Sequence, residues 1–556
     1  MTPSRIQFII PIWQRTYSWE WQQWRDLWED LMDLYEKLCK GESAQHFMGP
    51  IVLKTLEQKI GGITRWVIID GQQHLTTLLL ICALIRDMAK DRGDINLVKE
   101  IEGQFLFNEF AKKIEDKPKL FPTEADRKFF DLILRGEKLN VDQSSQLHAA
   151  YAFFEETFKT EQASLELERL LDCVRSLKMV TIRLEEGDNP NRIFETLNFR
   201  GKPLAQSDLV RNFFMMSIKE PAKADDVYLN VWFPMQQALG KDTLQRIENL
   251  EMFLRHYMVM IKQTVVREDK IYTEIRGRLK HYNEDQMISE LQIISEYSKL
   301  YERLLFPERE TDPEISKGIE RLNRLKIGVH YPFLLKIYKN FASQKVSKDD
   351  FCSILKIIES YIVRRFFKRL PTHSLNRLFA ELCKLHESNI SNELETLLAN
   401  KEEWTAQYWP KDEDFKEQFL KLPIYKISSE KCRFVLETLE EYFKHPEPVK
   451  LDNLWIEHIM PETLSPEWKE YLGENWKATY DNYLHTIGNL TLIAPDRDIS
   501  IQNKMYSEKK KEWYDTSNIS LTRELKDNWD NWRESQILER AKILAERAIK
   551  IWPRPE

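Results

Sequence analysis

The chain has 556 residues, enough for about three or four domain-sized units, so a single small binding module is excluded. Apolar residues make up 42% and charged residues 31%, with only 16 glycines, which is typical of a folded protein and not of a collagenous or disordered one. The 82 Lys and Arg against 89 Asp and Glu give a formal charge of -7, so nucleic-acid binding would need local positive patches.

No segment is expected to cross a membrane. The longest apolar run, residues 75–85, is too short to span a bilayer and is interrupted by Thr76 and Thr77. The N-terminus lacks a basic segment followed by an apolar one. The six cysteines are scattered with no Cys-x-x-Cys pair, which indicates neither a disulfide framework nor a zinc ribbon. We therefore expect a cytoplasmic protein without membrane contact.

The N-terminal third alternates short apolar runs with amphipathic ones. A Trp-rich amphipathic helix is expected after the first run, a buried helix over 75–88, and a charged helical insertion over about 90–175. The β-type runs span 8–12, 50–56, 65–69 and 178–184. This pattern predicts a unit of strands and helices that closes near residue 215.

Two further units follow along the chain. Residues 216–420 carry long helical patterns with Glu- and Lys-rich faces and no fixed-period repeat, which predicts an all-helical middle domain over 216–445. The composition changes to that of a linker near 446–450, after which short β-type runs precede a terminal amphipathic helix. The predicted fold class is therefore α+β, predominantly helical, with domains at 1–215, 216–445 and 446–556.

Two basic runs could contact a nucleic-acid backbone. The first, in the middle domain, holds four positive charges and no acid; the second lies near the end of the chain. The candidate contact residues are Arg364, Arg365, Lys368 and Arg369 in the first run and Lys509 and Lys510 in the second. The alternative for the first run is that Phe366 and Phe367 pack inward while solvent surrounds the cations.

A histidine stands beside a carboxylate in the C-terminal unit, in the pair Glu457-His458. Asp498 and Asn503 follow and add two more oxygen donors. A lone histidine usually has a structural role, but oxygen ligands can hold Mg²⁺ or Mn²⁺ while a neutral imidazole takes a proton from water. This combination suits phosphodiester hydrolysis. We predict a catalytic set with metal ligands Glu457, Asp498 and Asn503 and with His458 as the base.

The sequence Asp70-Gly71-Gln72-Gln73 joins a predicted strand to a predicted helix. Free N–H groups and the positive dipole end at a helix N-terminus attract phosphate. Gly71 permits tight backbone geometry, and Arg15, next to Gln14, could supply a bidentate cation. Strand-turn-helix units with Asp-Gly are also common as structural connections, so the chemistry alone leaves both roles open.

The C-terminal motifs resemble the HNH nuclease domain of the GmrD type over roughly residues 452–513. They are Glu457-His458-Ile459-Met460-Pro461, the run from Tyr483 to Leu492, Asn503 and Lys509-Lys510. The resemblance implies a ββα-metal finger with His458 as general base, and structural roles for His485 and Asn489. Asp498 departs from the Asn that relatives usually carry, but an aspartate is a competent oxygen ligand.

The N-terminal motifs look like the GmrS-type domain, whose fold is similar to ParB and sulfiredoxin. They are Pro-x-x-Gln-Arg-x-Tyr-x-Trp, Phe47-Met48-Gly49, Ile69-Asp70-Gly71-Gln72-Gln73, and Phe194-Glu195-Thr196-Leu197-Asn198-x-Arg200-Gly201 with Leu204 and Asp208. The resemblance implies an NTP-binding site made by Gln14, Arg15, Asp70, Gly71, Gln72, Gln73 and His74. His74 replaces the family's Arg and is mostly neutral at cellular pH, which favours binding over hydrolysis.

The combined resemblance spans most of the chain and implies a type IV, modification-dependent restriction endonuclease of an anti-phage system. It implies metal-dependent cleavage of modified phage DNA, regulated by nucleotide at the N-terminal domain. Trp13, Tyr17 and Trp19 are candidates for stacking on a modified base. The alternatives are a DNA sensor or scaffold with reduced catalysis and a nucleotide-controlled RNase, and a homodimer is left open.

Overall fold

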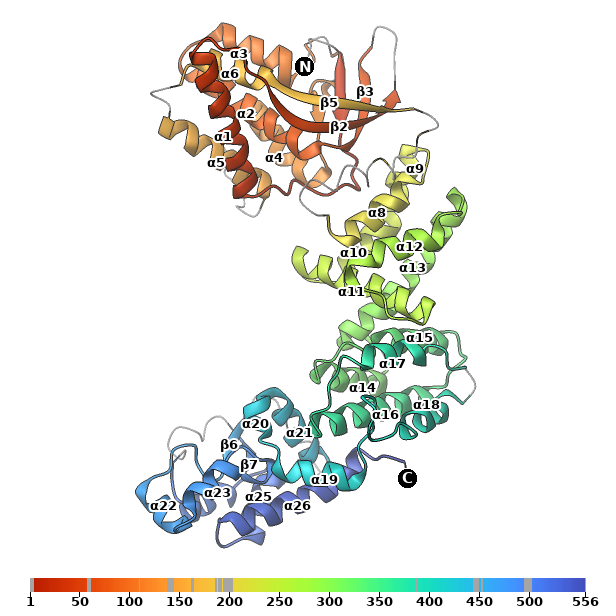
Figure 1. Cartoon of the computed structure of the whole chain (residues 1–556), viewed down its shortest axis with the longest axis vertical. Helices are drawn as coiled ribbons and strands as arrows, with labels where there is room; N and C mark the ends of the chain where they lie inside the picture. The colour runs from red at the N-terminus through yellow and green to blue at the C-terminus, as the bar shows by residue number, and fades with distance from the viewer. Residues whose placement is uncertain are drawn as a thin grey trace. The chain divides into compact units, whose positions relative to one another are not determined.

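The computed structural model describes residues 5–57, 62–109, 111–137, 145–161, 165–185, 188, 193, 204–386, 389–443, 450–451, 454–494 and 503–555. The described chain is predominantly helical with two small sheets, an α+β fold as predicted (Figure 1). It divides into two compact units, one of Met1–Glu251 with Glu268–Ser295 and one of Met252–Arg267 with Glu296–Glu556. The division into three domains stays a prediction.

The first unit is built on a five-stranded mixed sheet with the order β4-β1-β3-β2-β5. The strands are β1 (Ile6–Ile9), β2 (His46–Glu57), β3 (Thr64–Asp70), β4 (Leu120–Phe121) and β5 (Leu177–Leu184). β1 pairs in parallel with β3 and β4, and β2 pairs antiparallel with β3 and parallel with β5. Four of the strands overlap the predicted β-type runs. β4 lies inside the segment that the sequence predicts as a helical insertion.

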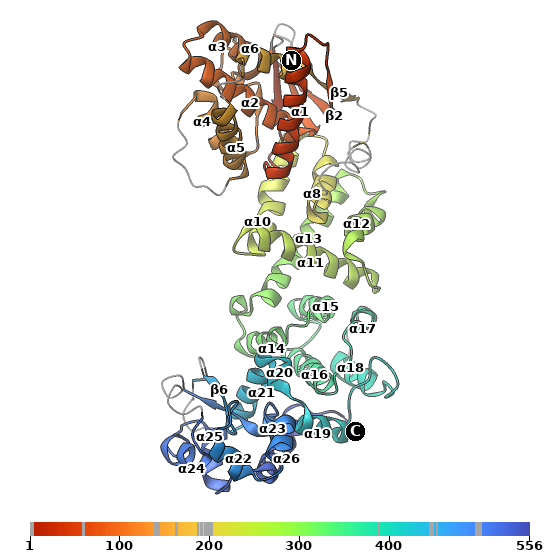
Figure 2. The same ribbon diagram turned by 60° about the vertical axis from the view of Figure 1, so that its left-hand side comes forward.

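Alternation along the strands gives this sheet two apolar faces. Ile51 and Leu53 of β2 belong to the large core under the helices that follow the strands, whereas Val52 belongs to a second cluster with Met216. Both views place α2, α4, α5 and α6 on one side of the sheet (Figure 1 and Figure 2). The helices up to β5 are α1 (Trp21–Cys39), α2 (Gln72–Asp91), α3 (Ile95–Ile101), α4 (Glu124–Arg135), α5 (Gln146–Glu161) and α6 (Leu167–Ser176).

Between the two sheets, the residues that the structure describes form helices and the turns that connect them. Several begin at serine N-caps, such as Ser347 before α16 and Ser428 before α21, whose hydroxyls accept main-chain N–H groups. These helices are α8 (Gln206–Met216), α9 (Pro221–Val227), α10 (Phe233–Ala238), α11 (Thr243–Lys262), α12 (Ile271–Leu279), α13 (Glu284–Leu305), α14 (Pro313–Arg324), α15 (Tyr331–Ala342), α16 (Lys348–Phe367), α17 (Leu375–Leu382), α18 (Ile390–Ala399), α19 (Asp412–Lys421), α20 (Ile424–Ile427) and α21 (Ser429–Glu441).

The end of the second unit contains a two-stranded antiparallel sheet of β6 (Trp455–His458) and β7 (Leu490–Ile493). Its helices are α22 (Pro466–Leu472), α23 (Trp476–Tyr483), α24 (Tyr506–Lys509), α25 (Ser520–Asn528) and α26 (Glu534–Ile551). Trp468, Tyr514 and Trp532 are fully buried in the core that these elements share. Within the described residues, no helix combines the length and the apolar character needed to cross a membrane.

Candidate functional site

The hairpin of β6 and β7 brings together the two C-terminal motifs that the sequence singles out. Glu457 lies opposite Thr491 in the ladder. Asn489 closes the end of the hairpin, because its side-chain amide donates to the carbonyl of Met460 at 3.0 Å and accepts the N–H of Met460 at 2.8 Å. The predicted structural role of Asn489 is therefore confirmed.

Arg540 of α26 supports the same hairpin. Its guanidinium is buried and donates to the main-chain carbonyls of Gly488 at 2.9 Å and Leu490 at 2.7 Å. A Cβ at position 488 would collide with the carbonyl oxygen of Ile537, so the glycine permits the close approach of α26. The sequence motifs did not indicate Arg540.

Glu457 does not face the histidine that follows it. Its carboxylate is buried and pairs with the ammonium group of Lys509 at 2.5 Å. Lys509 also donates to the carbonyls of His458 at 2.9 Å and Ile459 at 3.3 Å, and burial lowers its pKa while Glu457 opposes that shift. The two groups therefore satisfy each other inside the domain, and metal binding by Glu457 and nucleic-acid contact by Lys509 stay predictions.

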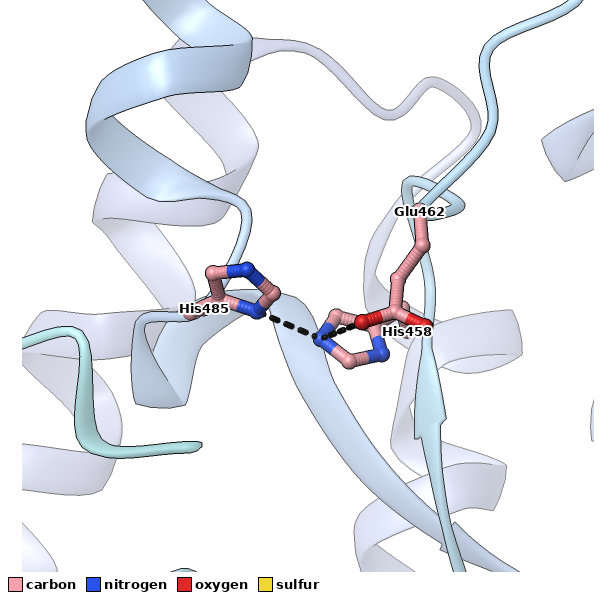
Figure 3. A group of neighbouring side chains, drawn as sticks. All are labelled: His458, Glu462 and His485. Atoms are coloured by element: carbon pink, nitrogen blue, oxygen red, sulfur yellow. Dashed lines mark hydrogen bonds and ion pairs between the residues drawn. The ribbon is translucent and has the colours of Figure 1, made fainter. Parts of the chain in front are cut away.

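His458 points to a different cluster, shown in Figure 3. Its Nε2 lies 3.1 Å from Nδ1 of His485 and 4.0 Å from a carboxylate oxygen of Glu462. His485 follows α23, whereas Glu462 follows β6, so the cluster joins the two ends of the segment between the strands. His485, for which the sequence predicts a structural role, contacts the proposed base His458 directly.

Both imidazoles are held in the neutral form. Burial lowers the pKa of His458 to about 3, and the positive charge that His485 and Lys509 can carry adds to this effect. Burial also lowers the pKa of His485, with the carboxylate of Glu462 opposing it. A neutral imidazole offers a lone pair, which both a general base and a metal ligand require.

Tyr425 of α20 covers the histidine pair. Its ring meets His458 edge to face at a centroid distance of 4.7 Å and stacks on His485 at 5.7 Å. Its main-chain N–H donates to the carbonyl of His485 at 3.3 Å. Tyr425 lies well before the C-terminal motifs in the sequence, and no local signal marked it.

The cluster offers three ligand atoms to a cation. One atom each from His458, Glu462 and His485 lies within 4.8 Å of the others. Two imidazoles with a carboxylate suit Mn²⁺ or Zn²⁺ better than Mg²⁺, which prefers oxygen ligands. Asn503 is exposed just before α24, and Asp498 lies outside the described residues.

The N-terminal motif lies where β3 meets α2. Gly71, the residue before α2, has a left-handed φ of 94°. A Cβ there would lie 3.1 Å from the side chain of Ile51 on β2, so both conformation and space require glycine. Asp70 ends β3, and burial raises its pKa while the Gly71 N–H and the charge of Arg15 oppose that shift.

Gln14, Gln72 and Gln73 hold the loop between β1 and α1 against β3 and the start of α2. Gln14 donates to the carbonyl of Ile68 at 2.7 Å, and Gln73 accepts the N–H of Ser18 at 2.9 Å. Gln72 donates to the carbonyl of Arg15 at 3.3 Å, but its buried Oε1 has no hydrogen-bond partner in the described part of the chain. That oxygen could accept a hydrogen bond from a ligand.

Charged groups of both signs surround Arg15. Burial lowers the pKa of its guanidinium, whereas Asp208 and Asp70 raise it and Arg211 lowers it further. Arg211 and Asp208 form an ion pair at 2.8 Å. Two carboxylates therefore offset the two guanidinium groups. The matching motif from Phe194 to Gly201 lies outside the described residues.

The aromatic residues of the N-terminal motif belong to the interior. Trp13, Tyr17 and Trp19 are only 6%, 5% and 9% exposed. Stacking of one of them on a modified base therefore stays a prediction that would require these side chains to become accessible. Trp19 packs edge to face on His74 at 4.7 Å, and burial lowers the pKa of His74 to about 4, so this imidazole carries no positive charge at neutral pH.

The two sites lie in regions of the chain that match models of known protein families. A model of the GmrSD restriction endonuclease N-terminal domain matches residues 2–215, and one of the GmrSD C-terminal domain matches residues 409–547. The chain belongs to the GmrSD restriction endonuclease family. It is therefore a nuclease of a restriction system, with DNA as its partner. No curated protein was found to match the chain.

The GmrSD match at the C-terminal end begins at residue 409, upstream of the linker that composition suggests near 446. The matched segment therefore includes α19, α20 and α21 together with the hairpin and most of α26. Tyr425 and the His458 cluster lie in the same family domain.

Two arginines predicted to contact DNA are buried in α16. Arg364 is fully buried and donates to the carbonyls of Trp552 at 2.7 Å and Pro410 at 3.1 Å. Arg365, 2% exposed, donates to the carbonyl of Tyr408 at 2.7 Å. These arginines hold the chain around them and do not form the DNA-contacting surface that the sequence predicts for this GmrSD protein.

The remaining basic candidates are nearer the surface. Lys368 pairs with Asp414 at 2.5 Å, and Lys510 pairs with Asp530 at 2.8 Å. Arg369 is exposed, in a left-handed conformation with a φ of 54°. Of the six basic residues predicted to meet DNA, Arg369 is the most open to solvent.

Proposed function

We propose that the chain is a metal-dependent, HNH-type DNA endonuclease that acts on modified phage DNA in the cytoplasm. Its N-terminal domain, of ParB and sulfiredoxin type, would regulate cleavage through a bound nucleotide. The family membership supports the nuclease class. The observation that carries the catalytic assignment is the neutral, buried imidazole of His458, 3.1 Å from His485 at the end of a β-hairpin.

His458 is proposed as the general base for hydrolysis. With its proton on Nδ1, the ring would present a lone pair at Nε2, the atom that lies 3.1 Å from Nδ1 of His485. A water molecule that displaces His485 would take its place at Nε2 and lose a proton to it. Tyr425 holds both rings in place and limits access to solvent.

A divalent cation would be held beside this base by Glu462 and His485, with Asp498 and Asn503 as further predicted ligands. When bound, the cation would stabilise the negative charge that develops on the phosphate. A second candidate arrangement is that His458 itself is a ligand, because its nitrogen lies within 4.8 Å of the other two donor atoms. The two arrangements differ in whether His458 is needed for metal binding.

Replacing His458 with Ala tests the catalytic assignment. We expect cleavage of supercoiled DNA in Mn²⁺ or Mg²⁺ to fall by about 10²- to 10⁴-fold while DNA binding persists, because the group that accepts the proton is lost. The matched control is His373→Ala, which removes an exposed histidine. Unchanged cleavage by the His458 variant would remove the proposed base, and no cleavage by the wild type would favour a DNA-sensing scaffold.

Metal binding separates the two arrangements at the cluster. Calorimetric titration with Mn²⁺ should show weaker binding in Glu462→Gln and His485→Ala if these side chains are ligands. If His458→Ala retains its Mn²⁺ affinity, His458 is a base and not a ligand. If all three variants lose affinity equally, His458 is a third ligand.

His74→Arg tests the nucleotide site. We expect the wild type to bind NTP with little hydrolysis, because the pKa of His74, near 4, leaves no positive charge beside the phosphates at neutral pH. Phosphate release should rise in the variant. Rapid hydrolysis by the wild type would contradict this explanation.

DNA substrates test the remaining part of the proposal. Phage DNAs that carry different modifications should be cleaved to different extents, and adding nucleotide should change that pattern. Equal cleavage of modified and unmodified DNA would exclude modification dependence. Preference for RNA in a competition assay would favour the RNase alternative.

A further inference from the structure

A cavity of about 570 Å³ lies in the first unit, between the sheet and the helices that cover it. Residues of β1, β2 and β5 form one wall, and α2 with the π-helical turn Glu102–Leu106 forms the other. A well-packed core has few voids larger than a water molecule, whereas ligand sites measure roughly 300–1,000 Å³. The volume therefore indicates a binding site, which neither the hairpin nor the Gly71 loop uses.

Apolar side chains form only slightly more than half of the cavity wall, and they gather between the sheet and α2. Phe8 of β1, Leu79 of α2 and Phe105 contribute large side chains, and Met179 of β5 lines the cavity near the sheet edge. In this apolar part, a sugar or a bare phosphate would lose hydrogen bonds to water without replacing them. The body of a ligand should therefore be an aromatic ring or an acyl chain.

One part of the wall carries a buried cation. Nζ of Lys119 donates to the carbonyls of Gly103 and Gln104, each at 2.7 Å, and the residue is only 3% exposed. An ammonium group has three N–H donors, so one is left for a ligand. Burial lowers the pKa of Lys119 and the charge of Glu109 opposes that shift, so a bound anion would further favour its charged form.

The other cations near the cavity are not available to a ligand. Arg175 already pairs with Glu100 at 2.5 Å and Asp172 at 3.0 Å. Lys178 alternates with Met179 along β5, so its side chain lies on the face of Ile182 and Leu184, away from the cavity. Lys119 has no ion pair with an acid in the described part of the chain, and a buried cation of this kind beside the cavity favours a ligand with a negative head group.

We propose that this cavity binds an amphipathic small-molecule anion. Its apolar body lies between the sheet and α2, and its carboxylate, sulfonate or phosphate head lies at Lys119. The site contacts α2 along Leu75, Leu78, Leu79 and Cys82, beyond the Asp70 to His74 loop. It is therefore a second small-molecule site in the N-terminal unit, independent of nuclease activity.

Binding of 8-anilinonaphthalene-1-sulfonate to the full chain tests the proposal. We expect saturable fluorescence enhancement with one site per chain. Met179→Trp, which fills the cavity from β5, should weaken binding by about tenfold or more. Val180→Trp is the matched control, because Val180 is the next residue on the same strand, is 54% exposed and does not line the cavity. Equal affinity in both variants would overturn the proposal.

The charge of the head group is tested separately. Lys119→Met should weaken binding of the sulfonate by about tenfold or more, because the buried cation beside the head group is lost. It should leave unchanged the affinity for the uncharged N-phenyl-1-naphthylamine. Lys54→Met, on the opposite face of the sheet, is the control. If Met179→Trp does not fold, an unchanged sulfonate affinity in Lys119→Met, or no saturable binding to the wild type, overturns the proposal.

Discussion

His330 is enclosed at the start of α15, where it is 1% exposed. Neither ring nitrogen makes a hydrogen bond to the described residues, and burial lowers its pKa to about 3. In the unfolded chain the pKa of a histidine is about 6.5. Between these values the unfolded chain binds a proton that the folded chain does not. The free energy of unfolding therefore falls as the pH drops from about 6.5 toward 3.

Replacing His330 with Phe removes this proton uptake from the unfolded chain. Between pH 7 and pH 5, the wild type should lose about 2 kcal/mol more unfolding free energy than the variant. Urea titrations at the two pH values measure the difference. His373→Phe, at an exposed position, should behave like the wild type. Equal losses in the wild type and in His330→Phe would contradict the prediction.

The residues around His458 show which parts of a site a sequence can predict. The motif located the histidine at the end of a strand, but it grouped Glu457 with His458 although neighbours in a strand point to opposite faces. That alternation was available from the sequence and argues for a structural Glu457. Glu462 and Tyr425 reach the imidazole from outside the strand, and only the folded chain brings them there.

At the scale of elements, the pair of Glu457 and Lys509 fastens α24 to β6. The ion pair is buried, and Lys509 also reaches two carbonyls at the end of β6. Removing one partner of a buried pair leaves the other charge without compensation. The pair therefore holds the last residue of α24 against the strand that carries His458.

Lys509→Met should lower the free energy of unfolding by about 3–5 kcal/mol, because the buried carboxylate loses its cation. The double variant Glu457→Gln with Lys509→Met should be more stable than Lys509→Met alone, since no unpaired charge remains. Lys511→Met, at an exposed position two residues on, is the control. Chemical denaturation of the four proteins gives the comparison. A double variant less stable than Lys509→Met alone would exclude a charge-pairing role.

Element prediction succeeded where the hydrophobic pattern was long. The β-type runs at 50–56 and 178–184 lie within β2 and β5, because several alternating residues mark each strand. β4 has two residues, Leu120 and Phe121, and is a strand only because β1 offers it main-chain partners. No pattern of two residues can indicate such a pairing.

Across the whole molecule, charge in the sequence did not predict which cations are accessible. Arg364 and Arg365 stand in a run without acids, yet both are buried and bonded to carbonyls. A helix turns neighbouring side chains in different directions, and a guanidinium group can satisfy several carbonyls at once. The composition of this segment indicates a basic run, but it does not indicate which other segments cover that run in the folded chain.

The same two arginines tie residues 406–410 to α16, just where the C-terminal family domain begins. Farther on, the carboxylate of Glu440 on α21 accepts the N–H groups of Ser520 and Leu521 at the start of α25. A nuclease fragment that begins at the linker near 446 would lack both Glu440 and Tyr425, whose ring packs on His458 and His485. A minimal nuclease fragment should therefore begin before residue 409.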